Sequence, residues 1–156
     1  MHIFIILLFI FTNVFSKKLL RLSEDATRKM STINHFVSIS VKTEFSRAQI
    51  SKMIQNYGCH CFPQYSKTVS GTGMHVDELD YVCKQLGNCH KCVNIDFPGE
   101  CSTDFGRYKY NVNYTTGEID CSENPNECKR SQCECDKKFA LDLGKVWDDE
   151  KYGENF

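Results

Sequence analysis

Residues 57–92 read YGCHCFPQYSKTVSGTGMHVDELDYVCKQLGNCHKC and hold five of the ten cysteines of this 156-residue chain. None of the ten lies before this stretch. Residues 61–75 contain Gly71 and Gly73 and predict a loop. Val76–Cys92 predicts a helix, because Asp77 is a favourable N-cap and apolar residues then recur every three or four positions. Its inward-facing residues are Leu79, Val82, Cys83, Leu86 and His90.

Residues 1–16 have the features of a secretory signal peptide, with cleavage expected after Ser16. The apolar run over residues 3–11 is too short for a membrane anchor, the alternative, which needs ~20 apolar residues. A secretory route lets disulfides form, and ten cysteines is an even number. We therefore expect a secreted, disulfide-rich protein of one domain.

The formal net charge is −1, so no global field attracts the chain to nucleic acid. The charge is unevenly distributed, however. Residues 17–52 carry eight basic and three acidic side chains, whereas the charged residues after Ala140 are mainly acidic. We divide the mature chain into a basic N-terminal arm or pro-segment (17–44), a folded domain (45–143) and an acidic tail (144–156). Weak alternation over residues 36–41 would allow a short strand, but the segment has no clear period and is assigned no structure; it could equally be a partner-binding arm.

Further elements are expected inside the domain. Ser46 and Gln49 form a capping box that begins a short amphipathic helix over residues 45–56. Alternation over 108–114, a turn at 115–118 and a return strand from Ile119 predict a β-hairpin. Asn124 is predicted to cap a second long helix that ends near Gly144.

Three segments resemble the secreted phospholipase A2 family: YGCHC (57–61), VDELDYVCKQLGNC (76–89) and CSENPNECKRSQCECD (121–136). The family pattern runs YGCxC, a glycine-rich loop, DxCCxxHDxC, and later CxxxxxxCxxxxCxCD. The resemblance extends from Tyr57 to about Leu143. It implies a mainly α, disulfide-rich fold, with two long antiparallel disulfide-linked helices and a small β-wing.

The resemblance also implies a set of bridges. These are Cys61–Cys83, Cys89–Cys135, Cys101–Cys128 and Cys121–Cys133. A further family bridge falls on Val82 and Asp142, so both of its cysteines are absent together.

Cys59 and Cys92 are left over. They either pair with each other or one of them bonds another chain. A zinc site built from Cys59-His60-Cys61 and Cys89-His90-Lys91-Cys92 is the alternative, which an oxidising compartment disfavours.

The catalytic positions of the family are replaced here. Leu86 stands where the family has the histidine that takes a proton from the attacking water, and Gly87 where it has the calcium-binding aspartate. Leu86 accepts no proton and Gly87 has no carboxylate. Residues 62–65 (FPQY) stand in place of the glycines of the calcium loop. We therefore expect no intact catalytic residue, no calcium or other cofactor, and no metal.

The supporting shell of that site is retained in part. Asp136 matches the aspartate that orients the family's histidine, Tyr110 matches a tyrosine that bonds to it, and His90 replaces the second such tyrosine. A His90–Asp136 dyad, one helical turn along, is the remaining route to general-base catalysis.

The leading hypothesis is a secreted phospholipase A2-like protein that has lost calcium-dependent hydrolysis and binds a phospholipid surface or a protein partner, but not nucleic acid. One alternative is an active phospholipase A2 that hydrolyses the sn-2 ester with a rearranged site. Another is a disulfide-rich structural or matrix component, which an intermolecular bond of Cys59 or Cys92 would favour. The oligomeric state is left open.

Overall fold

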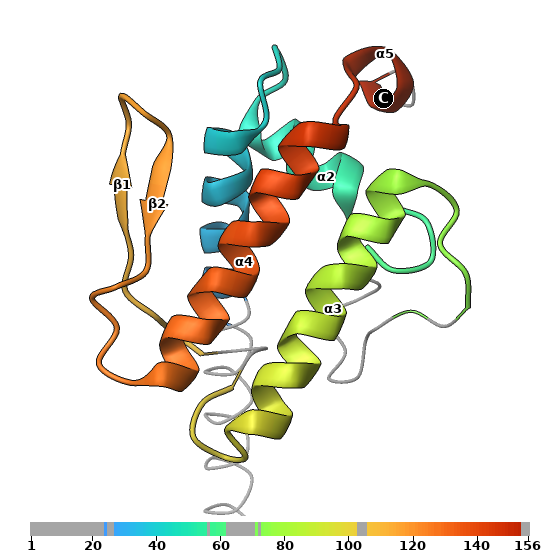
Figure 1. Cartoon of the computed structure of the whole chain (residues 1–156). Helices are drawn as coiled ribbons and strands as arrows, with labels where there is room; N and C mark the ends of the chain where they lie inside the picture. Colours follow the sequence, from blue (N-terminus) through green and yellow to red (C-terminus); the bar gives the residue numbers. More distant parts are fainter. Residues whose placement is uncertain are drawn as a thin grey trace, which may run out of the picture.

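The computed structural model describes residues 24, 27–55, 57–61, 71, 73–102 and 106–153. Two long helices, α3 (Glu78–Asp96) and α4 (Glu127–Val146), lie side by side and antiparallel (Figure 1). A two-stranded sheet flanks α4 on the side away from α3. The mainly helical fold with a small β-wing is therefore confirmed. The predicted signal peptide and residues 17–23 of the predicted arm lie outside the described residues.

The start of α3 is where the sequence places it. The Asp77 carboxylate accepts a hydrogen bond from the Asp80 amide at 3.0 Å, and two acidic side chains occupy the first turn, where the helix dipole favours them. The helix ends at Asp96, one turn later than predicted. Its inward face packs Leu79 and Leu86 into the core.

The second long helix begins at a different cap. Asn126, not Asn124, accepts the Lys129 amide at 2.9 Å. Asn124 is buried, and its side chain hydrogen-bonds to backbone groups of Lys109 and Cys121. It therefore joins the segment that leads into β1 to the segment that follows β2. Two asparagines flank Pro125, and the sequence alone favoured the wrong one.

The helix also continues through Gly144 to Val146. A Cβ at Gly144 would lie 2.4 Å from the carbonyl oxygen of Ser40. This glycine therefore allows α4 and helix 27–40 to approach each other closely, and it does not end α4.

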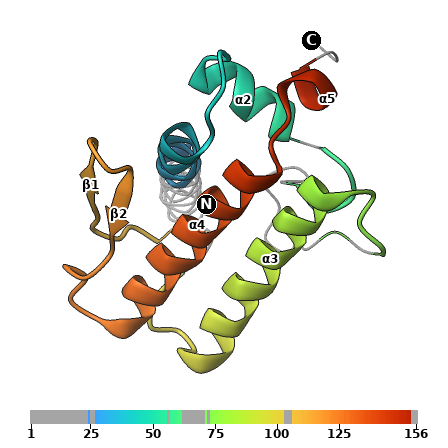
Figure 2. The same ribbon diagram turned by 45° about the horizontal axis from the view of Figure 1, so that its top comes forward.

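Residues 27–40 are helical, so the short strand that the alternation over 36–41 allowed is not formed. Ile33, Phe36 and Val37 recur at helical spacing and are at most 2% exposed. The weak alternation was one part of a longer 3.6-residue period. In Figures 1 and 2 this helix lies between α4 and the β-wing, so residues 27–41 belong to the folded body rather than to an arm.

The β-wing is shorter than the predicted hairpin. Strand β1 (Asn111–Asn113) pairs antiparallel with β2 (Glu118–Asp120), with Val112 opposite Ile119. Tyr108 and Tyr110 precede β1 and turn toward the helices. The ring of Tyr110 meets that of Phe36 edge-on at 4.7 Å.

Two short helices complete the body. The predicted capping box is confirmed at α2 (Arg47–Ile54), where Ser46 and Gln49 bond each other's backbone. Near the C-terminus, α5 (Asp149–Gly153) buries Tyr152 against the ring of Tyr57. The predicted acidic tail is thus packed onto the body as far as residue 153.

The four family-type disulfides are present. The Cys59–Cys92 pair is not, and both of these described side chains are free and exposed. The amide of Cys59 donates to the Asp80 carboxylate at the start of α3, whereas Cys92 lies three turns further along that helix. Their separation of about 18 Å along the axis is too long for a disulfide.

Among the described residues, no helix is both long and apolar enough to cross a membrane.

Candidate functional site

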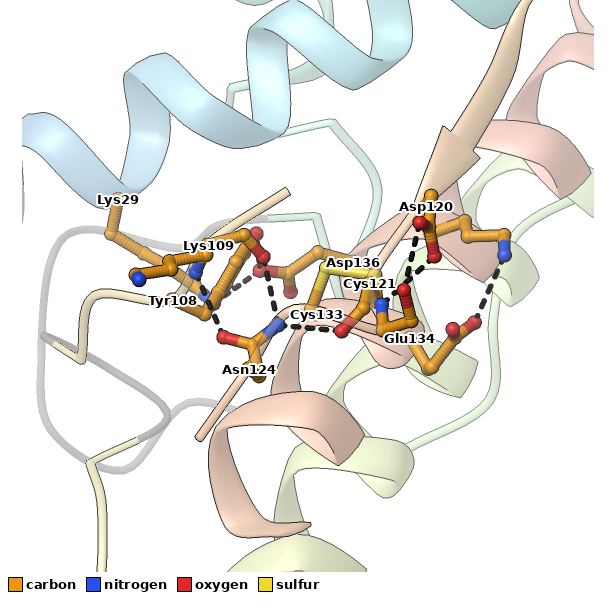
Figure 3. Close-up of a disulfide and its surroundings, with 11 residues drawn as sticks. Lys29, Tyr108, Lys109, Asp120, Cys121, Asn124, Cys133, Glu134 and Asp136 are labelled. Carbon is orange, nitrogen blue, oxygen red and sulfur yellow. Dashed lines mark hydrogen bonds and ion pairs between the residues drawn. A yellow bond between two sulfur atoms is a disulfide. The ribbon is translucent and has the colours of Figure 1, made fainter. Parts of the chain in front are cut away.

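The candidate site is built around Asp136, a fully buried carboxylate on the face of α4 that meets α3. His90 of α3 places Nε2 2.7 Å from Oδ1. The hydroxyl of Tyr108 donates to Oδ2 at 2.5 Å, and Lys29 Nζ pairs with the same oxygen. Figure 3 shows Lys29 reaching from its helix toward Tyr108 and Asp136. Three separate segments thus converge on the carboxylate that α4 carries.

These partners keep Asp136 ionised. Burial alone raises the pKa of a carboxyl group, but the charge of Lys29 and the contact with His90 outweigh it and hold the pKa of Asp136 below its ordinary value. Burial and the neighbouring Asp136 charge raise the pKa of Tyr108, so its hydroxyl stays a donor. The Lys29 ammonium also lies 4.6 Å from the centroid of the Tyr108 ring.

Lys29 is the residue that the sequence reasoning missed. It lies one turn before Ile33 on the buried face of helix 27–40, and its own side chain is 5% exposed. The helical spacing of 29, 33 and 36 was the available signal. A lysine at the end of an apolar face is usually solvated, so the pattern alone gave no reason to bury it.

The tyrosine of the shell was assigned two positions too late. Tyr108 binds Asp136, whereas the Tyr110 hydroxyl lies 3.0 Å from His35 Nδ1. Side chains two apart in an extended segment point to the same side. The motif therefore could not separate Tyr108 from Tyr110 without the packing of helix 27–40.

The two replaced dyad positions lie beside this cluster on α3. Leu86 is 6% exposed and packs in the core, as predicted. Gly87 offers no carboxylate. His90 and Asp136 are brought together as the sequence predicted, while no proton acceptor stands at position 86.

The described residues do not fit a calcium site. Calcium takes six to eight oxygen ligands, usually with carboxylates among them. Asp80, the buried carboxylate nearest YGCHC, already accepts three backbone amides, those of Cys59, His60 and Val76, at 2.7–3.0 Å. Gly58, with φ of +58°, allows this approach, because a Cβ there would lie 2.3 Å from Asp80 Cγ.

Burial raises the pKa of Asp80, but those amides outweigh it and lower the pKa below its ordinary value. Asp80 is therefore a structural anchor for the YGCHC turn. Within the described ranges, no three His, Cys, Asp or Glu side chains are grouped to hold a metal. Residues 62–65 lie outside the described residues.

The cluster has limited capacity for base chemistry. A carboxylate assists a histidine base by stabilising the imidazolium that forms. Here Lys29 already neutralises Asp136, so the carboxylate stabilises a positive charge on His90 less effectively.

Comparisons with known proteins agree with this architecture. Residues 34–154 match the model of the phospholipase A2 family. The chain is 36% identical over 87 residues to a group IID secretory phospholipase A2 of Mus musculus, covering 56% of this chain and 53% of the relative. It is 36% identical over 86 residues to an acidic phospholipase A2 homolog of Bungarus fasciatus, covering 55% and 64%.

A longer match, 30% identical over 120 residues, is to a phospholipase A2 of Calliactis polypus and covers 76% of this chain and 68% of the relative. The chain spans just over half the length of the mouse relative. The family model covers most of the chain, from the middle of helix 27–40 to α5, and the four bridges implied by the family pattern are formed. The chain therefore belongs to the phospholipase A2 family.

Proposed function

We propose that this chain is a secreted phospholipase A2-like protein that has lost calcium-dependent phospholipid hydrolysis and acts as a binding module. The observation that carries the proposal is that the Asp136 carboxylate is fully engaged by other side chains. Both of its oxygens are bonded, by Lys29, Tyr108 and His90, and position 86 holds a buried leucine. The carboxylate that orients the base in the family is thus committed to an internal ion pair.

Two further observations support the loss of hydrolysis. Gly87 has no carboxylate for calcium, and the described carboxylate of Asp80 is used by backbone amides. General-base and metal assistance each contribute orders of magnitude to a hydrolytic rate. With both removed, we expect no release of fatty acid above the uncatalysed rate.

A phospholipid surface is the first partner to test. Met74 and Val76, just before α3, are 82% and 64% exposed and form an apolar edge at the start of that helix. Apolar side chains at such an edge can insert into the interfacial region of a bilayer. A protein partner is the second possibility. Secretion is supported by the four disulfides and by the secretory relative.

Hydrolysis of phospholipid vesicles, with calcium and with a chelator, tests the loss of activity. We expect no sn-2 fatty acid above blank in either condition. The alternative, an active enzyme with a rearranged site, rests on the 2.7 Å His90–Asp136 contact. Release that is calcium-dependent, disappears in His90→Ala and persists in His75→Ala would establish that alternative.

Vesicle binding is scored by co-sedimentation in the same samples. We expect binding without calcium, and at least a several-fold loss in Met74→Ser/Val76→Ser, because the exposed apolar edge is removed. Tyr114→Ser, which removes an exposed ring on the β-wing, is the matched control. Unchanged binding in the double variant, or none by the native protein, would turn the search to protein partners.

A further inference from the structure

The solvent face of α3 carries a regularly spaced set of residues that takes no part in the core. Its positions alternate in steps of four and three residues, as in the seam of a coiled coil: Tyr81, Gln85, Asn88, Cys92 and Ile95. At 100° per residue these positions centre on the side opposite the buried residues Leu79, Leu86 and Val93. The repeat is therefore a face presented to solvent along the length of the helix.

Within the described residues, the ring of His75 packs against Tyr81 at one end of this face, and the seam positions from Asn88 to Ile95 are exposed. Tyr81 is 40% exposed and Ile95 is 66% exposed. Cys92, at the fourth position of the seam, is exposed and free, whereas Cys89 one turn earlier is bonded to Cys135. A free thiol thus lies within a helical seam, whereas the other cysteines of the described helices are all paired.

The charges that flank the seam are complementary to those of an identical helix. In the heptad register, Lys91 occupies a g position and Asp96 the following e position. In a parallel pair, Lys91 of one copy faces Asp96 of the other, twice by symmetry. Both side chains are exposed, and within the described part of the chain neither forms an ion pair. Both are therefore available to a second copy.

We propose that two copies of this chain associate through parallel α3 helices and are joined by a Cys92–Cys92 disulfide. The parallel arrangement places identical residues opposite each other, so Asn88 meets Asn88 and their side-chain amides can hydrogen-bond to each other across the seam. An antiparallel pair centred on Cys92 instead sets Asn88 opposite Asp96. It also carries Tyr81 beyond the end of the other helix, leaving that ring unpartnered.

The covalent step is a two-electron oxidation. One Cys92 thiolate attacks a small-molecule disulfide of the glutathione class, forming a mixed disulfide and releasing one thiolate. Cys92 of the second copy then attacks the Cys92 sulfur of the mixed disulfide and displaces the second small thiolate. The two Cys92 thiols lose two protons and two electrons, and the small disulfide is reduced to two thiols. Because the seam is only partly apolar, the disulfide supplies most of the association.

Cross-linking in a glutathione redox buffer tests this arrangement on the full chain. The native protein is expected to run as a dimer without reductant and as a monomer with a mild reductant, and mass spectrometry is expected to identify Cys92 linked to Cys92. Cys92→Ser is expected to be monomeric, while Cys59→Ser, the matched free-thiol variant, is expected to dimerise as the native protein does.

A second variant tests the direction of the helices. In the Cys92→Ser background, Asn88→Cys places a thiol four residues earlier in the seam, where a parallel pair in the native register brings two copies of it together and an antiparallel pair centred on position 92 does not. We expect this double variant to recover the dimer, and Lys91→Glu to slow native cross-linking several-fold, with recovery in Lys91→Glu/Asp96→Lys. A native monomer in the redox buffer, a link through Cys59, or failure of Asn88→Cys to cross-link would each overturn the proposal.

Discussion

At the scale of single residues, Lys29 supplies the positive charge that compensates the buried carboxylate of Asp136. Its ammonium is buried with Asp136, and removing one partner of such a pair leaves an uncompensated charge that costs about 3–5 kcal/mol. We expect Lys29→Met to lower the free energy of unfolding by that amount, measured in urea with the disulfides intact.

The surface pair of Lys138 and Asp142 provides the control for this prediction. Lys138 is largely exposed, so Lys138→Met should change the free energy of unfolding by no more than about 1 kcal/mol. The double variant Lys29→Met/Asp136→Asn removes both charges and is expected to recover most of the loss. Equal effects of the two single lysine variants would show that the Lys29–Asp136 pair contributes little.

At the scale of elements, Asp77 joins the start of α3 to α5. Its carboxylate caps the helix and accepts from the Tyr57 hydroxyl at 2.6 Å, and Lys151 Nζ lies 2.9 Å away. Burial raises the pKa of Asp77, but these bonds outweigh it and lower the pKa to about 2. Since the unfolded pKa is about 3.9, this stabilisation is complete above about pH 5 and is lost as the pH falls toward 2.

Asp77→Asn separates the charge from the cap. Asparagine is as good an N-cap as aspartate, so the variant keeps the α3 start and loses only the ionisable group. We expect its free energy of unfolding to fall less steeply than that of the native protein between pH 5 and pH 2. Asp77→Ala should lose about 1 kcal/mol more at every pH, because the cap is also removed. Parallel curves for native protein and Asp77→Asn would contradict the lowered pKa.

At the scale of the whole molecule, each disulfide is expected to stabilise the fold according to the number of residues in the loop that it closes. Cys89–Cys135 joins α3 to α4 across 46 residues, whereas Cys121–Cys133 closes only 12. Chain entropy alone gives about 4 kcal/mol for the first and about 3 kcal/mol for the second. Paired alanine variants, compared by urea unfolding, are expected to differ in that order. The reverse order would mean that local packing outweighs chain entropy.

How much of this molecule could be predicted from sequence differs between its parts. Cysteine spacing and cap residues identified α3, the four bridges and the His90–Asp136 contact, because these depend on local spacing or on a family pattern. Helix 27–40 was missed, since its apolar period is short and it has no cysteine. Because that helix was missed, the role of Lys29 was missed as well, and Tyr110 was chosen in place of Tyr108. Both assignments depend on how helix 27–40 packs against α4.

Both oxygens of the Asp136 carboxylate are already bonded. The effect of a substitution at one position of this site therefore depends on the residues at the others. A histidine restored at position 86 would compete with Lys29 and His90 for Asp136, and an aspartate restored at position 87 would add a charge to a site whose calcium loop is altered. Neither change alone frees Asp136 to orient a histidine at position 86, and removing Lys29 first exposes the fold to the cost of an unpaired charge. The internal ion pair therefore couples these positions: the effect of a histidine at position 86 or an aspartate at position 87 depends on whether Lys29 is present.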